Sequence, residues 1–563
     1  MRLSKATLVL LGCSAVLLVG RVAPAAPTAA PPALTPAQQQ LIAACRPGPE
    51  PRVNGPAIIA VRPGTPLLHA LAVSGERPMT FAVENLPPGL TFNPDSGLLT
   101  GQLNQPGEHL IAYHAINARG EAHGRLTVRC GQTLAWLPPL GWNSYDAFDD
   151  AVTEDEVLAN ARWLKEHLQP LGWDTVVVDF RWYDPAAQGL AVRDPNLVMD
   201  AFGRLQPAPN RFPSAADGKG FRPLADQVHA LGLKFGIHIM RGIPRRAVEL
   251  DTPIADSAGT ARAAVVPADD VNRPCKWNRD MYAVDGAQPA GLAWYASIVK
   301  QYADWGVDYL KADDMSFLQQ GRYYATAEIE ALHQACRNSG RSIILSLSPG
   351  PTPTNRARHV RRYANLWRIS SDFWDRWNQL DQSFGLIAEW LPDAGPGCWP
   401  DADMIPLGHI RLRYGRGKPD RWTNFTPDEQ LTLISLWCLA PSPLMLGMNL
   451  PDNDEWTAAL LTNPEVLALN QDPWAKAARR TTGLPTRSEV WLRDLQDGSL
   501  AVGIFNRSDE PDEAVLLWRD LGLTPPVKVR DLWLRQDLDA PDSFTAALAP
   551  HACRLLRLQP AAP

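Results

Sequence analysis

Two stretches far apart in the sequence each run from apolar residues into aspartate. Residues 307–314 contain Asp313 near their end, and residues 366–372 finish at Asp372. This pattern is typical of strands in a (β/α)₈ barrel whose last residues reach the face on which such barrels carry their chemistry. Two carboxyl groups that face each other over a pocket are the minimum needed to cleave a glycosidic bond. Asp313 and Asp372 are therefore candidate catalytic residues.

Each aspartate has a basic residue that would share its face of the strand. Lys311 precedes Asp313 by two residues and Arg368 precedes Asp372 by four, and side chains at even spacing lie on one face. A nearby cation keeps a nucleophilic carboxylate ionised, whereas an acid needs partial burial or a neighbouring negative charge to keep its proton. Arg368 could bind substrate hydroxyls. In a purely structural interpretation, Asp313 would end a strand and Asp372 would cap a helix.

Other polar residues lie in or at the end of predicted strands. Asp179 ends the second strand, His238 lies in the third, and a short strand near 399 leads to Asp401 and Asp403. Unpaired buried charge is costly, so these residues indicate a shared polar site at one end of a barrel. The two consecutive aspartates of the first stretch could suggest a metal. Without a histidine beside them they are weak evidence, and we predict no metal.

The elements that must position these residues fill the middle of the chain. From about 135 to 472, strand, loop and helix patterns alternate, which is the order of a barrel built on a parallel sheet. We place the catalytic barrel at 133–475, with a long loop at about 241–292 as an insertion over its active face. Eight strands are expected, at 140–145, 175–179, 235–240, 308–311, 342–347 and 366–369, in a short segment ending at 403, and at 443–446.

Segments rich in predicted strands flank the barrel on both sides. Residues 45–132 show short alternating runs separated by Pro and Gly turns, a pattern typical of a small β-sandwich. The part around 86–101 resembles the immunoglobulin-like modules attached to secreted bacterial enzymes. Residues 476–563 return to strands without long helices. The predicted fold is multidomain, α/β plus all-β: a (β/α)₈ TIM barrel between an N-terminal immunoglobulin-like β-sandwich and a C-terminal antiparallel β-sandwich.

The N-terminus has the features of an export signal. Two basic residues, Arg2 and Lys5, precede an apolar run at 6–20, and small residues follow at the expected cleavage site. We predict a signal peptide at 1–25, a Pro/Ala-rich linker at 26–44, and a periplasmic or extracellular location. A lipoprotein box ending at Cys13 is a less favoured alternative, because the apolar run continues past it. The run at 6–20 is itself short for a membrane span, and no internal membrane helix is predicted elsewhere in the sequence.

Composition and cysteine spacing narrow the expected partners and cross-links. The 563 residues carry a net charge of -6 and no run of Lys or Arg, so nucleic acid is not an expected partner. The 20 tryptophans could serve as platforms for sugar rings or build a large aromatic core. Of the eight cysteines, Cys45 and Cys130 flank the first β domain and could pair across its ends. The oligomeric state is left open.

Several of these stretches resemble glycoside hydrolase family 27, the melibiase family of α-galactosidases and α-N-acetylgalactosaminidases. Motifs that carry the resemblance lie at 138–144, 306–313 and 498–502. The resemblance implies a retaining exo-glycosidase that acts on an oligosaccharide or polysaccharide and needs no cofactor, with Asp313 as the nucleophile and Asp372 as the acid/base. Sugar contacts are expected of the remaining candidates: Tyr145, Asp179, His238, Lys311, Ser348, Arg368 and Asp403.

Three positions depart from the family pattern and bear on the substrate. Phe180 replaces the second of two acids that hold O4 and O6 of galactose, Tyr145 replaces a tryptophan, and Ser348 replaces a glutamate often found near O2. Loss of an O6 contact is compatible with β-L-arabinopyranose, which is galactose without its hydroxymethyl group. A small residue near O2 is compatible with N-acetylgalactosamine. We expect release of terminal α-galactosyl residues, with those two sugars, or a non-catalytic carbohydrate-binding protein, as alternatives.

Overall fold

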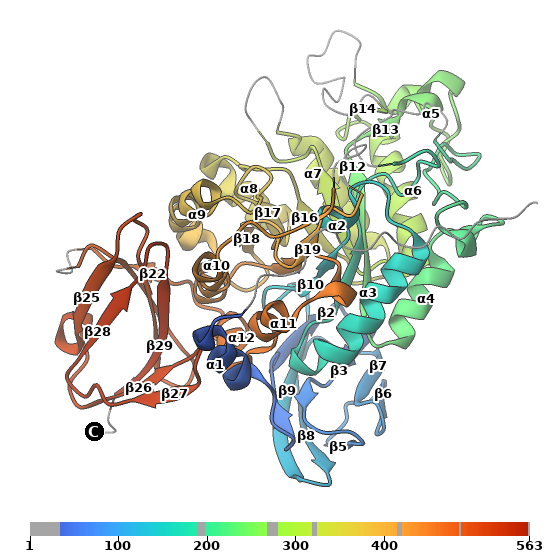
Figure 1. Ribbon diagram of the computed structural model, residues 1–563. Helices are drawn as coiled ribbons and strands as arrows, with labels where there is room; N and C mark the ends of the chain where they lie inside the picture. The colour runs from blue at the N-terminus through green and yellow to red at the C-terminus, as the bar shows by residue number, and fades with distance from the viewer. Residues whose placement is uncertain are drawn as a thin grey trace, which may run out of the picture.

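The computed structural model describes residues 34–188, 197–266, 280–317, 324–413, 419–482 and 486–560. The predicted signal peptide, with Cys13, lies outside these residues. Figure 1 shows a central barrel with a β-rich module of the N-terminal part of the chain below it and a second β-rich module, formed by the C-terminal part, at its left.

The barrel is built on one parallel sheet of eight strands within the described residues. The strand order is β18-β17-β16-β15-β12-β11-β10-β21. A parallel bridge between Ile405 and Leu446 joins the segment after β18 to β21, which brings the two edges of the sheet together. The predicted (β/α)₈ barrel is confirmed. Its strands are β10 (Leu140–Asn143), β11 (Thr175–Val178), β12 (Lys234–Met240), β15 (Tyr309–Asp313), β16 (Ile344–Leu347), β17 (Leu366–Arg368), β18 (Trp399–Asp401) and β21 (Leu444–Leu446).

Continuous apolar strands and amphipathic helices explain this architecture. All four residues of β11 are buried, as expected of a parallel strand that is covered on both faces. Helix α3 begins at a capping box between Thr153 and Glu156 and buries Val157 and Leu164 against the core. Besides α1 (Pro36–Cys45) and α5 (Arg245–Leu250), the helices of the described residues are α2 (Tyr145–Phe148), α3 (Glu154–His167), α4 (Arg222–Ala230), α6 (Pro289–Trp305), α7 (Thr326–Asn338), α8 (Ala357–Tyr363), α9 (Trp377–Trp390), α10 (Pro427–Leu439), α11 (Glu455–Thr462) and α12 (Pro464–Asn470).

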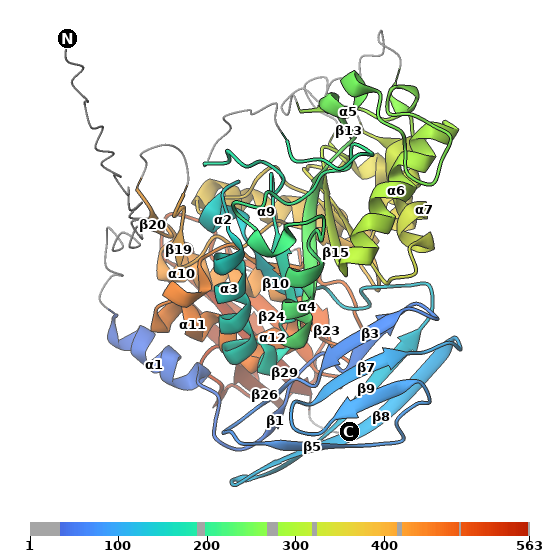
Figure 2. The same ribbon diagram turned by 90° about the vertical axis from the view of Figure 1, so that its right-hand side faces the viewer.

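The predicted insertion after the third barrel strand is present. It leaves the barrel directly after β12 and contains β13 (Ile243–Pro244), α5 (Arg245–Leu250) and β14 (Met281–Tyr282), with β13 and β14 paired antiparallel. Figures 1 and 2 both show it above the barrel, on the side opposite the N-terminal module. A second small antiparallel pair joins β19 (His409–Ile410) to β20 (Arg421–Trp422).

The N-terminal module consists of two facing sheets and a short strand pair. One sheet has the order β2-β9-β8-β5 and the other β3-β7-β6, and buried residues of both form one apolar core. A small β-sandwich is therefore present, while its assignment as immunoglobulin-like stays a prediction. The strands are β1 (Arg52–Val53), β2 (Ile58–Val61), β3 (Pro66–Ala70), β4 (Val73–Ser74), β5 (Thr80–Glu84), β6 (Leu90–Asn93), β7 (Leu98–Gln102), β8 (Gly107–Asn117) and β9 (Gly120–Cys130).

The C-terminal module confirms the predicted antiparallel β-sandwich. A sheet of order β22-β23-β24-β29-β26-β27 packs with the pair β25-β28 around a separate apolar core. The strands are β22 (Arg479–Arg480), β23 (Glu489–Asp494), β24 (Leu500–Phe505), β25 (Asp512–Leu517), β26 (Val527–Asp531), β27 (Gln536–Leu538), β28 (Ser543–Leu548) and β29 (Cys553–Pro560).

The end of the predicted linker is helical, which corrects the expectation of a tether up to residue 44. Helix α1 (Pro36–Cys45) starts at a capping box between Thr35 and Gln38. It buries Leu41 and Ile42 and packs against α11. Good capping and an apolar face therefore outweigh the Pro- and Ala-rich composition that suggested a linker.

The suggested pairing of Cys45 with Cys130 is wrong, because both thiols are free. The Cys45 thiol lies 3.7 Å from the carbonyl oxygen of Trp533 in the C-terminal module, whereas the Cys130 thiol lies 3.5 Å from the carbonyl oxygen of Leu103. Helix α1 carries Cys45 away from the end of β9, so the two sulfurs never approach bonding distance.

Among the residues that the structure describes, none of the helices combines the length and the apolar character needed to cross a membrane.

Candidate active site

One cavity gathers the predicted site residues at the end of the barrel where the strands finish. Its volume is about 540 Å³, which suits a small polar ligand such as a monosaccharide ring. Enzymes of this fold carry their active sites at the carboxyl ends of the barrel strands. All the predicted site residues except Asp401 line the cavity: Tyr145, Asp179, His238, Lys311, Asp313, Ser348, Arg368, Asp372 and Asp403.

Asp313 is the last residue of β15 and is held by two hydrogen bonds. His238 Nε2 lies 3.1 Å from one carboxylate oxygen, and the backbone N–H of Asp314 donates to the other at 2.7 Å. Burial raises the pKa of Asp313, but the bond from His238, the charges of His238 and Lys311 and the N–H of Asp314 together lower it below its ordinary value. Asp313 is therefore kept as an ionised carboxylate, the form that a nucleophile requires.

Lys311 contacts Asp179 rather than Asp313. Its ammonium nitrogen lies 2.8 Å from a carboxylate oxygen of Asp179, and the side-chain amide of Asn143 donates to the same oxygen at 2.6 Å. Burial raises the pKa of Asp179, yet the charge and hydrogen bond of Lys311 bring it well below its usual range. Lys311 therefore acts on Asp313 through its charge alone, and Asp179 fixes its position in the pocket floor.

Arg368 links the second candidate carboxylate to a third one. Its guanidinium lies 3.3 Å from Asp372 and 2.8 Å from Asp403. Arg368 and Asp403 are buried, whereas the side chain of Asp372 is 74% exposed. The predicted proximity of Arg368 and Asp372 is confirmed. Of the two settings expected for an acid, partial burial is not found, whereas a neighbouring negative charge is present in Asp403. Asp372 therefore lines the cavity where it is open to solvent.

The loop after β17 explains the position of Asp372. The backbone N–H of Phe373 donates to Asp403 Oδ2 at 2.8 Å, which anchors the loop and leaves the Asp372 side chain toward the cavity. Helix α9 begins only at Trp377, with Arg376 at its N-cap position. The alternative interpretation of Asp372 as a helix cap is therefore wrong.

Asp403 is held in an uncommon conformation at the pocket wall. Its φ is +86°, in the left-handed region, which is unfavourable for a residue with a Cβ and is found mainly at functional sites. The buried Asp401 accepts the backbone N–H of Asp403 at 2.8 Å and so fixes this turn. Burial raises the pKa of Asp403 to about 6, against the lowering effect of Arg368, and the charge of Asp372 adds to the rise. Asp401 itself lies behind the cavity wall.

An aromatic side chain lies close to Asp313 in the cavity. The Phe180 ring packs edge-to-face on His238, with ring centroids 5.5 Å apart and planes at 77°. His238 in turn contacts Asp313, so Phe180 is one side chain away from this carboxylate. Ser348 lines the same cavity, and its buried hydroxyl has no hydrogen-bond partner among the described residues.

Sequence reasoning missed several residues that line the pocket, among them the acids Asp146, Asp149 and Asp150. Asp146 follows Tyr145 on the short helix α2, lines the cavity and is almost fully buried. Its side chain lies so close to Gly447 that a Cβ there would come within 2.0 Å of Oδ2. Burial, with the charges of Asp403 and Asp179, raises its pKa well above the usual range. Asp146 lies on a helix and not at a strand end, where the candidates were expected. An acid directly after Tyr145 in the first motif was nevertheless a usable signal.

Comparisons with known proteins agree with this fold. The alpha galactosidase A family model matches residues 278–472, and the alpha galactosidase C-terminal beta sandwich model matches residues 486–558. Alpha-galactosidase 3 of Arabidopsis thaliana is 29% identical over 448 residues, covering 78% of this chain and 85% of the plant protein.

Two solved structures are more similar in sequence. A GH27 β-L-arabinopyranosidase from Geobacillus stearothermophilus is 45% identical with a TM-score of 0.72, covering 76% of this chain and 97% of that protein. A candidate α-N-acetylgalactosaminidase from Bacillus halodurans C-125 is 41% identical with a TM-score of 0.67, covering 76% of this chain and all of the other. The barrel, its polar pocket and these matches define a glycoside hydrolase. The chain belongs to glycoside hydrolase family 27, the family of the α-galactosidases.

Proposed function

We propose that the protein is a retaining exo-glycosidase that releases terminal β-L-arabinopyranosyl residues. The observation that carries this choice is Phe180 in the pocket wall, packed on His238 beside the candidate nucleophile. A phenyl ring offers no hydrogen bond to a hydroxymethyl group, and β-L-arabinopyranose is galactose without that group. The 45% identity to a β-L-arabinopyranosidase supports the same substrate.

The proposed reaction uses the two aspartates in turn. Asp313 attacks the anomeric carbon while Asp372 protonates the glycosidic oxygen, so the C–O bond breaks and a glycosyl ester forms on Asp313. Asp372, now ionised, takes a proton from water, and the resulting hydroxide attacks the anomeric carbon and releases Asp313. Two inversions leave the anomeric configuration unchanged. The exposed position of Asp372 allows both leaving group and water to reach it.

The polar groups around the pair hold the sugar hydroxyls. Lys311, which is half-buried, and Arg368, which is buried, present donors, and Asp179 and Asp403 present acceptors, all lining the same cavity. The raised pKa of Asp146 favours its protonated form, which donates a hydrogen bond instead of accepting two. We propose that these residues select an exo-acting, terminal sugar by filling its hydrogen-bonding positions.

Terminal α-galactosides are the second candidate substrate. The sequence analysis put them first, and the curated relatives that match over most of their length are named alpha-galactosidases. An apolar wall rejects an added hydroxyl by only about 100-fold, so a measurable α-galactosidase activity is expected beside the main one. A terminal α-N-acetylgalactosamine is favoured only by the small Ser348 and by the similarity to the Bacillus protein.

A panel of p-nitrophenyl glycosides tests the proposal. The panel holds the β-L-arabinopyranoside, the α-galactoside, the α-N-acetylgalactosaminide and, as a control, the α-glucoside. The highest kcat/KM is expected for the β-L-arabinopyranoside. A higher value for the α-galactoside would reject Phe180 as the selecting residue, and no hydrolysis of any member by folded protein would favour the carbohydrate-binding alternative.

Export to the periplasm or the medium is part of the proposal and rests on the sequence of residues 1–25. Cell fractionation of the full chain, compared with a variant in which the apolar run carries two charges, tests it. Retention of both proteins in the cytoplasm would contradict export.

A further inference from the structure

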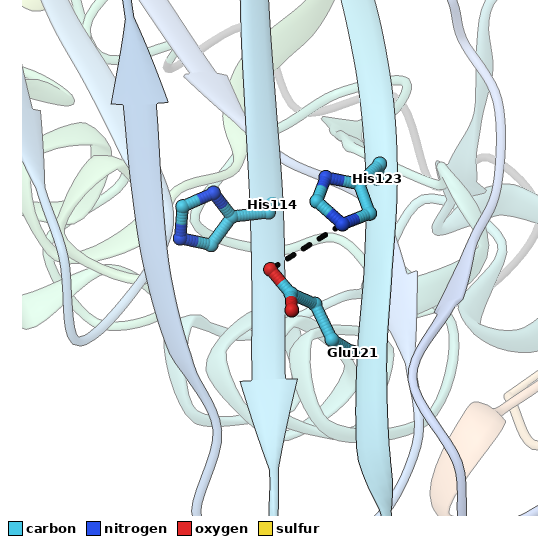
Figure 3. A group of neighbouring side chains, drawn as sticks. All are labelled: His114, Glu121 and His123. Carbon is cyan, nitrogen blue, oxygen red and sulfur yellow. Dashed lines mark ion pairs between the residues drawn. The ribbon is translucent and has the colours of Figure 1, made fainter.

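A group of metal-binding side chains lies on the N-terminal module, away from the active site. His114 on β8 and His123 on β9 stand directly opposite each other in the antiparallel register. Glu121 precedes His123 by two residues and therefore shares its face of the strand. Figure 3 shows the carboxylate of Glu121 between the two imidazole rings. One ligand atom from each residue lies within 4.8 Å of the others.

These side chains project from the outer face of the sheet. The neighbouring residues Tyr113 and Ala115 on β8 and Leu126 on β9 point inward and belong to the buried core. Packing therefore does not require the identity of His114 or His123. Glu121 and His123 are exposed and His114 is half-buried, so a cation from solvent can reach all three. The apolar inner face fixes the strand register and with it the spacing of the group.

The spacing already approaches that of a metal centre. His123 Nε2 and Glu121 Oε1 are 3.4 Å apart. Two ligands bound to zinc at about 2.0–2.1 Å in a tetrahedral arrangement are about 3.3 Å apart. The imidazole of His114, whose ring centroid is 5.8 Å from that of His123, closes the remaining gap by rotating about its side-chain bonds.

We propose that His114, Glu121 and His123 bind one divalent cation of the zinc class on the β8–β9 hairpin. Two imidazoles and one carboxylate are ligands that Zn²⁺ prefers, whereas Ca²⁺ and Mg²⁺ prefer oxygen ligands alone. Three protein ligands leave a fourth position for water. The cation joins the two strands near their turn and so stabilises the folded module by binding it in preference to the unfolded chain.

A shallow cavity beside the group gives the cation a partly enclosed setting. The cavity has a volume of about 380 Å³ and is bordered by His114, His123, Glu84 and Arg125. Glu84 adds a second carboxylate near the site and Arg125 an opposing positive charge. The group is separate from the candidate active site, because the active-site cavity is lined by residues of the barrel part of the chain whereas all three side chains lie on β8 and β9 of the N-terminal module, below the barrel in Figure 1.

Calorimetric titration of the chelator-treated full chain with ZnCl₂ tests the proposal. The wild type is expected to bind one Zn²⁺ at this site, and the variant His114→Gln/His123→Gln to lose that event or weaken it at least about tenfold, since even the groups that orient ligands contribute tenfold or more. His109→Gln removes another histidine of β8 and serves as the matched control, with binding unchanged. Equal binding by the wild type and the double variant, or none by the wild type, would overturn the site.

Titration with Co²⁺ supplies an independent readout. Ligation by two histidines and a carboxylate in a low-coordinate site gives visible d–d absorption, which is expected for the wild type and for His109→Gln but not for the double variant. Circular dichroism checks that the double variant is folded, as expected for substitutions outside the core. The same spectrum in all three proteins would reject these residues as the ligands.

Discussion

Two sets of side chains that line the pocket are held in different ways. In the first, the interlocked set, polar and charged groups contact each other in pairs: Lys311 with Asp179, Arg368 with Asp403, and His238 with Asp313. The second, the uncharged set, consists of single side chains such as those of Phe180 and Ser348. Under the proposed reaction the interlocked set does the chemistry, and removing one partner of an ion pair leaves the other charge without its counter-ion. A change in the uncharged set is expected to alter the choice of sugar and to leave the chemistry intact.

The largest effect is expected from Asp313→Ala in the interlocked set. Loss of the nucleophile should lower kcat/KM by about 10⁴-fold or more, because no glycosyl ester can form. Circular dichroism should show a folded protein. Added azide, a small external nucleophile, should restore part of the turnover. Wild-type activity in the folded variant would remove Asp313 from the reaction.

The next largest effect is expected from Lys311→Met. The buried carboxylate of Asp179 would lose its cation, at a cost of about 3–5 kcal/mol in the free energy of unfolding. Urea unfolding at pH 7 measures this. Because pairing lowers the pKa of Asp179, its stabilising contribution is present above the ordinary carboxyl pKa of about 3.9 and is lost as pH falls through the lower folded value.

The double variant Lys311→Met/Asp179→Asn is the control for that experiment. With no charge left to bury, it should recover most of the stability but none of the activity. If the single variant unfolds at the wild-type urea concentration, the pair does not hold the pocket as described.

A smaller, selective effect is expected from Phe180→Asp in the uncharged set. A carboxylate in the wall should raise the ratio of kcat/KM for the α-galactoside over the β-L-arabinopyranoside by about 10- to 100-fold. Phe180→Leu, which keeps the wall apolar, is the matched control and should leave the ratio within a few-fold of wild type. An unchanged ratio in Phe180→Asp would mean that another residue selects the sugar.

The smallest effect is expected from Asp146→Asn. The raised pKa of Asp146 means that the folded state holds this proton more firmly than the unfolded chain does, so stability falls as pH rises above the ordinary carboxyl value. An asparagine removes that penalty and keeps a donor. The melting temperature should rise by about 2 °C or more at pH 7 and less at pH 4. A lower melting temperature at pH 7 would show that Asp146 is stabilised as an ion.

The barrel and most of the pocket could be predicted because strand periodicity places alternate residues on one face and parallel strands end together. That rule alone predicts that Lys311 and Asp313 share one face of their strand and reach the same pocket. The solvent exposure of Asp372 was not predictable, because it depends on the hydrogen bond from Phe373 to Asp403 across two loops. Asp146 was missed because its burial arises from contact with Gly447, about 300 residues away in the sequence.

The N-terminal errors have a similar origin. Composition alone suggested a linker and a disulfide, but helix α1 packs on α11 and takes Cys45 to the C-terminal module. Such contacts between distant segments leave no local pattern. The paired histidines of β8 and β9, in contrast, follow from a hairpin register that the alternating apolar residues set.

The most direct test of the proposed reaction is to follow hydrolysis of p-nitrophenyl β-L-arabinopyranoside by proton NMR and observe which anomer of arabinose appears first. With Asp313 as nucleophile and Asp372 as acid/base, the β anomer should form first and then equilibrate with the α anomer. Initial formation of the α anomer would contradict the double-displacement mechanism, and the absence of released arabinose, with folded protein, would contradict the proposed substrate.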